Sequence, residues 1–145
     1  MWCYIVITVI LIISGWLCWY MMRVSNENLL EIRPSTVENS GNGVFLTRPV
    51  KMWDILTVSP VEVIPKESLR GSPSENYTFD GSLFGPGLSV LPSGFIRYVN
   101  HSDQPNCIQS TRVEQREMVL RALADMPSGT ELFINYGEGW WKSRE

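Results

Sequence analysis

The 145-residue sequence predicts a mainly β domain preceded by one transmembrane helix. Short β-branched or alternating runs recur after residue 33, and turn-forming residues separate them. No long segment with a 3.6-residue apolar period competes with these runs outside the N-terminus. The first 22 residues, in contrast, form one apolar run without a charged side chain. These three observations predict an anchor at 1–22, a linker at 23–32 and one domain at 33–145.

The N-terminal run matches a bilayer in length. At about 1.5 Å per residue, a helix over 1–22 spans about 33 Å. Aromatic residues, which favour the membrane interfaces, lie near both ends of the run: Trp2, Tyr4, Trp16, Trp19 and Tyr20. The alternative is a cleavable signal peptide, which usually has a basic start and small residues before its cleavage site. This run has no basic start and ends in bulky residues, so we expect an uncleaved single-pass anchor.

The charges after the run predict its orientation. Arg23 and Arg33 follow the run, and positive charge favours the cytoplasmic side, so the domain is expected there. Asn76 lies in a formal glycosylation sequon, which stays unmodified if the domain is never translocated.

Charge and cysteine content exclude several classes of protein. The formal net charge is −3 without a basic stripe, so we expect no direct binding of nucleic acid. Cys107 is the only cysteine outside the apolar run, which holds Cys3 and Cys18. The domain therefore has neither a disulfide framework nor a cysteine-rich zinc cluster, and we expect no metal site.

The expected strands follow the β-branched runs in chain order. They are 43–47, 54–59, 61–64, 76–79, 88–91, 95–99, 118–123 and 131–136. Residues 71–76, Gly-Ser-Pro-Ser-Glu-Asn, are expected to form an exposed loop.

Three stretches carry an unusual density of polar and glycine residues. FIRYVNHSDQPNC, residues 95–107, turns abruptly polar after Val99 and contains the only histidine, His101. NSGNGVF, residues 39–45, places two glycines directly before a strand, where a backbone can turn sharply or approach a ligand. GTELFINYGEGWW, residues 129–141, ends a strand in Tyr136 and adds paired tryptophans.

Together these stretches resemble the SET-domain protein lysine methyltransferases. The family's G-x-G-V-F-like segment is matched by Gly41, Asn42, Gly43, Val44 and Phe45. Its R-[FY]-x-N-H-S-x-x-P-N-C motif is matched by Arg97, Tyr98, Asn100, His101, Ser102, Pro105, Asn106 and Cys107, and its G-x-E-L-x-x-x-Y-G motif by Gly129, Glu131, Leu132, Tyr136 and Gly137. The resemblance covers residues 33–141, and the compact length is similar to minimal stand-alone SET proteins of large viruses and microbes.

The resemblance implies a SET fold of small sheets with a C-terminal pseudoknot, in which the N-H-S segment and the Y-G strand cross. It implies a pocket for S-adenosylmethionine on one face and a narrow channel for the substrate lysine from the other. The cofactor-binding residues that it implies are Gly41, Asn42, Gly43, Val44, Phe45, Arg97, Asn100, His101, Tyr136 and Trp141. A structural ion pair is the alternative role for Arg97, and packing is the alternative for Trp141.

The resemblance also assigns the catalytic residue and the channel. Tyr136 is the expected catalytic residue, with its hydroxyl at the methyl-transfer pore. Tyr77, Ile134 and Trp140 are the expected channel residues, and a core position is the alternative for each. Ile134 has no hydroxyl to hold a crowding water, so the channel is expected to admit an already methylated amine.

Departures from the family pattern leave a second function open. The chain has no Cys-x-Cys element after the domain, so either the paired tryptophans or a second subunit, as in a homodimer, is expected to complete the channel. We expect a protein-lysine methyltransferase acting on a histone or another basic protein, and the anchor favours a substrate near a membrane. The alternative is a catalytically weak SET-fold module that binds proteins.

Overall fold

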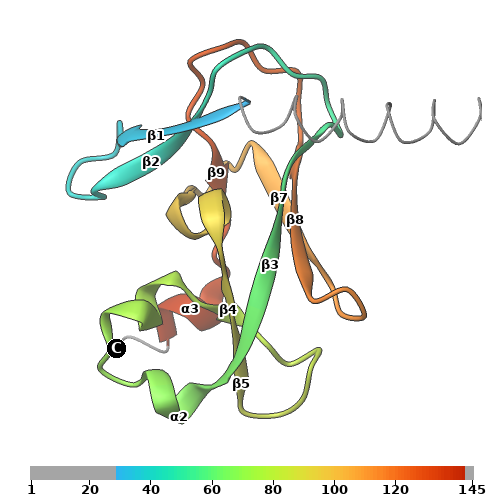
Figure 1. Ribbon diagram of the computed structural model, residues 1–145. Helices are drawn as coiled ribbons and strands as arrows, with labels where there is room; N and C mark the ends of the chain where they lie inside the picture. The colour runs from blue at the N-terminus through green and yellow to red at the C-terminus, as the bar shows by residue number, and fades with distance from the viewer. Residues whose placement is uncertain (1–28, 143–145) are drawn as a thin grey trace, which may run out of the picture.

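The computed structural model describes residues 29–142, and within them the predicted mainly β fold is confirmed (Figure 1). The described strands form three sheets. One pairs β1 (Leu30–Pro34) with β2 (Asn42–Leu46), and another pairs β6 (Asn100–His101) with β9 (Phe133–Ile134). The largest has the order β4 (Phe79–Asp80), β5 (Leu88–Pro92), β3 (Ile55–Pro65), β8 (Glu117–Ala122) and β7 (Cys107–Arg112). Three short helices lie between strands: α2 (Lys66–Leu69), η1 (Pro73–Tyr77) and η2 (Gly94–Tyr98). The described part of the chain ends in a fourth, α3 (Glu138–Lys142), which follows β9.

The domain begins earlier than the sequence predicts. The linker expected at 23–32 is wrong for its last residues, because Leu29 and Leu30 are buried and β1 starts at Leu30. Leu30 pairs with Leu46, and the Thr47 N–H donates to the Leu29 carbonyl at 2.9 Å. The anchor expected at 1–22 lies outside the described residues. Between residues 29 and 142, none of the helices has the length and apolar character that crossing a bilayer requires.

Two expected strands, 76–79 and 95–99, overlap 3₁₀ helices, and Phe79 of the first lies in β4. Pro73 stands in the first turn of η1, and the Ser72 hydroxyl caps this helix by accepting from the Ser74 N–H. Residues 71–76, which were expected to form an exposed loop, therefore contribute to the helix η1. At η2, Gly94 has φ 63° and the Val99 N–H bonds back to Ile96. Short apolar runs such as 95–99 do not distinguish strand from helix by periodicity.

Strand β7 was not predicted, although it has a buried face. Cys107 is buried and lies opposite Ala122 of β8, while exposed residues alternate with the inward-facing ones along the strand. The core lies on this side of the large sheet and includes Leu56, Val90 and Leu120, each fully buried.

Burial makes the Cys107 thiol unreactive. Burial raises the pKa of Cys107 to about 12, so almost no reactive thiolate exists near neutral pH. In a variant with Cys3→Ser and Cys18→Ser, we expect no alkylation by iodoacetamide at pH 8 until denaturant is added. Ser110→Cys in the same background is the control, because residue 110 is exposed on the same strand. Rapid native alkylation of Cys107 would show that the core around it opens readily.

The parallel pair β6–β9 brings two distant segments together. Asn100 lies opposite Phe133 and His101 opposite Ile134. The Asn106 side chain fastens the two segments, since its amide donates to the Glu131 carbonyl and its oxygen accepts from the Phe133 N–H, both at 2.8 Å. The N-H-S segment and the Y-G strand thus lie side by side, as the resemblance implies.

Candidate active site

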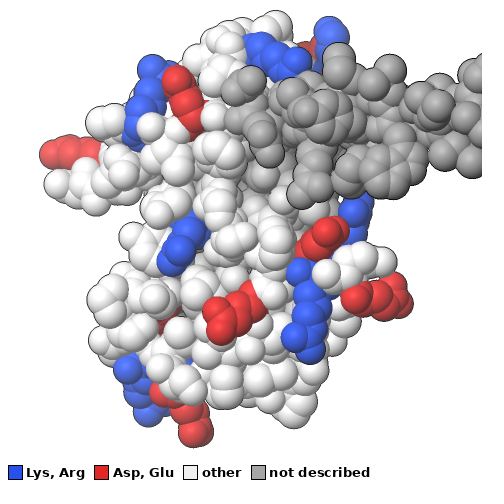
Figure 2. All heavy atoms as spheres, viewed as in Figure 1, with Lys and Arg blue, Asp and Glu red and all other residues white. Residues whose placement is uncertain are grey.

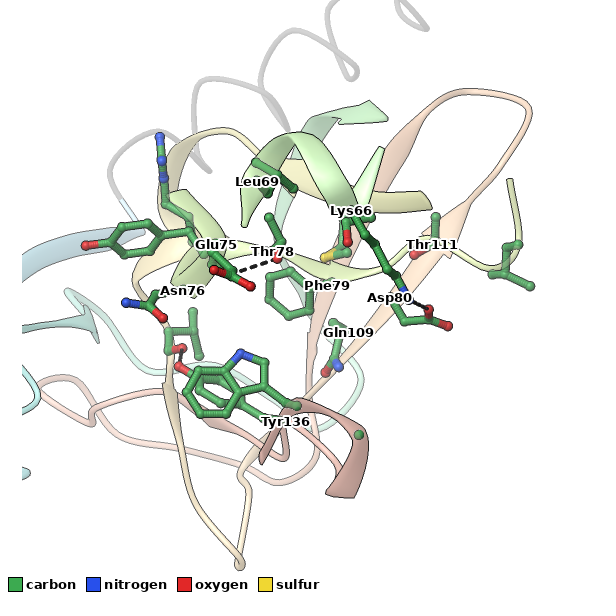
Figure 3. Close-up of a pocket in the computed structure, with 18 of the residues that line it drawn as sticks. Lys66, Leu69, Glu75, Asn76, Thr78, Phe79, Asp80, Gln109, Thr111 and Tyr136 are labelled. Atoms are coloured by element: carbon green, nitrogen blue, oxygen red, sulfur yellow. Dashed lines mark hydrogen bonds and ion pairs between the residues drawn. The ribbon is translucent and has the colours of Figure 1, made fainter. Parts of the chain in front are cut away.

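A cavity of about 1020 Å³ opens beside the end of β9. Figure 3 shows side chains from α2, η1, β4 and β7 turned toward one space, together with Tyr136. Among the residues expected in the site, four line this cavity: Tyr77, Arg97, Tyr136 and Trp140. The glycine segment 41–45, Asn100, His101 and Trp141 are not among its lining residues.

Tyr136 joins the cavity to the N-H-S segment. Its hydroxyl donates to the Val99 carbonyl at 2.8 Å, and its ring lines the cavity. Its backbone N–H donates to His101 Nδ1 at 3.1 Å. Because Nδ1 accepts, the imidazole proton belongs on Nε2, which lies 3.2 Å from Asp103 Oδ1 and donates to it. The expected catalytic tyrosine is therefore held at its backbone and at its hydroxyl.

Aromatic rings form a continuous wall around Tyr136. Its ring centroid lies 4.7 Å from Trp140 and 5.3 Å from His101. The Trp141 ring meets the His101 ring edge to face at 5.1 Å. The wall therefore has one ring, Trp140, on the cavity, and another, Trp141, against the N-H-S segment.

The Asn100 side chain reaches the glycine segment. Its amide nitrogen lies 3.1 Å from the Asn42 carbonyl, 3.0 Å from Ser35 Oγ and 3.3 Å from Glu131 Oε1. The amide N–H groups are thus used within the protein. The side-chain oxygen accepts none of the described hydrogen bonds, so it is the atom of Asn100 that a ligand would meet.

Glu131 organises this side of the site, a role that sequence reasoning missed. It is 5% exposed and accepts from the Ser35 hydroxyl at 2.7 Å and from the Thr36 N–H at 2.8 Å. It also accepts from the Thr36 hydroxyl and from Asn100. Burial by itself raises the pKa of Glu131, but these hydrogen bonds outweigh burial and leave its pKa below the usual value. The only sequence signal was its place in the third motif.

Replacing the Glu131 carboxylate should lower stability in a pH-dependent way. In Glu131→Gln an amide N–H₂ replaces one acceptor oxygen, and the loss is expected to be about 1–3 kcal/mol at pH 7. The folded-state pKa is lowered, so the carboxylate's contribution is present above about pH 4.3 and is lost as pH falls through the folded pKa. Urea denaturation at pH 7 and pH 4 should therefore show a smaller difference between wild type and variant at pH 4. Exposed Glu62→Gln is the control, and an equal difference at both pH values would contradict the role of the charge.

Arg97 makes no ion pair within the described residues. The structural ion pair that was the alternative role for Arg97 is therefore not found there. Its guanidinium carbon lies 5.0 Å from the Tyr77 ring centroid and 5.8 Å from that of Tyr98. Its Nε is buried without a hydrogen-bond partner among residues 29–142. A buried donor without a partner is costly, and the Arg97 side chain to which it belongs lines the cavity.

Ile134 is corrected from a channel residue to a core residue. It is fully buried, belongs to the core cluster and does not line the cavity. It is the last residue of β9, whereas Tyr136, two positions later, lies beyond the strand and is only partly buried. The expectation that the channel admits an already methylated amine was based on Ile134, so the structure does not support it through this residue.

The structure adds charged residues that sequence reasoning did not place near the site. The cavity is lined by Lys66, Glu67, Arg70, Glu75 and Asp80, with Lys66 Nζ 3.5 Å from Asp80 Oδ1. Lys66 and Glu67 lie in α2, and Arg70 follows this helix directly. Glu75 lies in η1, within the segment 71–76 that was expected to form a loop, and Asp80 lies in β4. Their signs are mixed, and Figure 2 likewise shows Lys and Arg interspersed with Asp and Glu over the visible face.

The fold and site define a β-rich domain whose N-H-S and Y-G segments meet at a tyrosine. A model of the SET domain matches residues 19–137, and the chain belongs to the SET-domain family. It is a protein-lysine methyltransferase of this type.

Two curated relatives are similar over different shares of the chain. A histone-lysine N-methyltransferase of Schizosaccharomyces pombe, specific for H3 lysine-37, is 27% identical over 77% of this chain and 76% of that protein. A histone-lysine N-methyltransferase of Fusarium mangiferae, specific for H3 lysine-9, is 38% identical over 43% of this chain. That match spans 21% of the Fusarium protein.

Solved structures share the fold. A Plasmodium falciparum protein described as a histone methyltransferase matches with a TM-score of 0.60 and 25% identity, over 79% of this chain and 97% of that one. An active polycomb repressive complex 2 in the basal state matches with a TM-score of 0.64 over 75% of this chain and 15% of that one. At 23% identity, the second similarity shows the fold alone.

Proposed function

We propose that this chain transfers a methyl group from S-adenosylmethionine to a lysine side chain of a histone or another basic protein. The observation that carries the proposal is the position of Tyr136. Tyr136 lines the cavity and its hydroxyl donates to the Val99 carbonyl, while its backbone N–H donates to His101 in the N-H-S segment. A substrate in the cavity and a cofactor at Asn100 and His101 would therefore meet at this residue.

The residues present fit the cofactor. S-adenosylmethionine has an adenine ring, a carboxylate and a cationic ammonium and sulfonium. Trp141 and His101 offer rings for the adenine, and Asn100 Oδ1 can accept from the ammonium. The Arg97 side chain lines the cavity, and its guanidinium charge would attract the carboxylate; its Nε has no hydrogen-bond partner among residues 29–142. Gly41 has no atom within 4 Å of its ideal Cβ position, so its backbone is open to approach.

The protein's contribution to transfer is positioning and desolvation. When bound, the cofactor supplies an electrophilic methyl group on its sulfonium. A lysine that enters between Phe79, Trp140 and Tyr136 leaves water, which lowers its pKa and favours the neutral amine. The lysine proton is released to solvent. The hydroxyl of Tyr136, fixed by Val99, steadies the polarised methyl group, and the aligned groups reduce the entropic barrier.

Support for the substrate class comes from the relatives and from the cavity. Both curated relatives carry names of histone-lysine methyltransferases. Glu67, Glu75 and Asp80 line the cavity and favour a cationic side chain over an apolar one. Lys66 and Arg70 on the same lining select against a uniformly basic peptide, so we expect a target lysine with acidic as well as basic neighbours.

The full chain in detergent or nanodiscs tests the proposal. Calorimetry should show binding of S-adenosylmethionine, weakened at least about tenfold in Asn100→Ala. Labelled cofactor should then deliver methyl groups to histones or lysate proteins, with lysine identified by mass spectrometry. Absence of binding in a folded chain would overturn the proposal. Binding without transfer to any protein would instead favour the protein-binding module.

We also propose that residues 1–22 anchor the chain in a membrane with the domain on the cytoplasmic side. The support is the charge-free apolar run and the arginines that follow it. Asn76 is exposed within its sequon and reports orientation in a eukaryotic membrane assay. The anchor should resist carbonate extraction and Asn76 should carry no glycan. A glycan on Asn76 would overturn the orientation, and release by carbonate would overturn the anchor.

A further inference from the structure

The connection between β2 and β3 displays two large apolar residues in an unusual way. Trp53 has φ 72°, in the left-handed region that large L-residues rarely adopt. It is 55% exposed, and its neighbour Met52 is 51% exposed. A tryptophan therefore occupies a strained, exposed position that glycine would occupy without strain. An outlier of this kind points to a function for the residue.

Hydrogen bonds hold this turn in place. The Trp53 N–H donates to the Ala122 carbonyl at 2.9 Å, and the Arg121 guanidinium donates to the Trp53 carbonyl at 3.2 Å. The Met52 N–H donates to Asp125 Oδ1 at 2.8 Å, and the Lys51 N–H to Asp54 Oδ2 at 2.8 Å. The turn is thus rigidly presented by its contacts with β8 and the segment after it.

The turn lies at the end of the domain where the chain enters it. The Thr47 N–H donates to the Leu29 carbonyl, so the first described residue lies beside the start of the connection. In Figure 1 the start of β1 and the β2–β3 connection are both at the upper end. Helix α2 and strand β4, which line the cavity, lie at the lower end.

The length of the link limits how far this end can stand from a bilayer. Between the expected anchor and Leu29 are six residues, 23–28. Six extended residues span at most about 20 Å. The link therefore keeps the surface nearest Leu29 within about 20 Å of the bilayer, and this is the surface of the domain that is best placed to touch the membrane.

We propose that the face formed by Arg48, Lys51, Met52 and Trp53 lies in the head-group region of the bilayer that holds residues 1–22. This inference rests on the proposed membrane anchor. Tryptophan favours the interface because its ring is apolar and its N–H is polar, and methionine adds apolar area. Lys51 is paired with Asp125 at 2.7 Å, and Asp54 lies in the same turn, so acidic residues offset the basic ones. We therefore expect contact with a neutral bilayer, without a requirement for anionic lipid. The cavity at the opposite end remains free for a protein substrate.

A fluorescent label at residue 53 tests this contact. The full chain with Cys3→Ser and Cys18→Ser is used, because Cys107 is buried and does not compete for the label. Trp53→Cys carries an environment-sensitive nitrobenzoxadiazole group, and Leu83→Cys carries it in the control. Leu83 is 66% exposed, lies between β4 and β5 and lines the cavity. The connection between β4 and β5 is at the lower end in Figure 1. Both proteins are reconstituted into phosphatidylcholine vesicles with and without a lipid that is spin-labelled near its head group.

The expected result is a blue-shifted emission at position 53 and quenching by the spin-labelled lipid several-fold stronger than at position 83. Equal emission and quenching at the two positions, in vesicles that retain the chain after carbonate washing, would overturn the inference and leave the anchor standing. Release of the chain by carbonate would overturn the anchor and the inference together. Methyl transfer by the unlabelled wild-type chain in vesicles of the same lipid reports separately on the proposed enzyme.

Discussion

The Tyr136→Phe variant is expected to transfer methyl groups about 10²–10³-fold more slowly than the wild type. Its affinity for S-adenosylmethionine should change little. The tyrosine hydroxyl is fixed by the Val99 carbonyl at 2.8 Å, and the ring is held among His101 and Trp140. A preorganised polar group of this kind acts mainly on the transition state, so its loss lowers the rate more than ground-state binding. Single-turnover rates with labelled cofactor, together with calorimetry, measure both quantities.

Tyr98→Phe is the matched control for this variant. Tyr98 is half-buried and contacts the Tyr77 ring at 6.0 Å, but its hydroxyl makes none of the described hydrogen bonds. We expect near wild-type rates from it. Phe at position 136 also leaves the Val99 carbonyl unpaired, with an expected loss of about 1 kcal/mol in the free energy of unfolding. Full activity of Tyr136→Phe in a folded protein would contradict the catalytic role.

The Gly43→Ala variant should lose both stability and cofactor binding. An ideal Cβ at position 43 would lie 2.1 Å from Glu131 Oε1 and 3.4 Å from Asn100 Nδ2. The Glu131 carboxylate cannot retreat without losing its hydrogen bonds to Ser35 and Thr36. Overpacking together with a disturbed buried carboxylate predicts a loss of about 2–4 kcal/mol in the free energy of unfolding. Because Asn100 moves with Glu131, cofactor affinity should fall by at least about tenfold.

Gly139→Ala provides the comparison for steric effects. Gly139 lies in α3, and its ideal Cβ position has no atom within 4 Å. Alanine there should leave stability unchanged or raise it by up to about 1 kcal/mol. Urea denaturation and calorimetry on both variants separate a clash at position 43 from a general effect of adding a methyl group. Wild-type stability in Gly43→Ala would show that the Glu131 network adapts easily.

The sequence by itself determined the fold class and the segments that form the candidate site. Alternating β-branched runs and turn formers are local signals, because the side-chain period of a strand can be read from neighbouring residues. The three motifs indicated the SET family, and two of them meet in the parallel pairing of Asn100 with Phe133. Tyr136 was identified in the same way, since its motif places it at a strand end.

Only the tertiary structure decided what surrounds these residues. The Glu131 network joins Ser35 and Thr36 to a residue about a hundred positions later, and no local pattern encodes such a contact. Ile134 and Tyr136 are two positions apart within the run that was expected to be one strand, yet β9 ends at Ile134, which is in the core, and Tyr136 lines the cavity. The strained Trp53 is likewise visible only through its backbone angle and its bonds to β8. In each case the deciding energy comes from burial and hydrogen bonding between segments far apart in the chain, which depend on how the sheets pack and not on neighbouring residues.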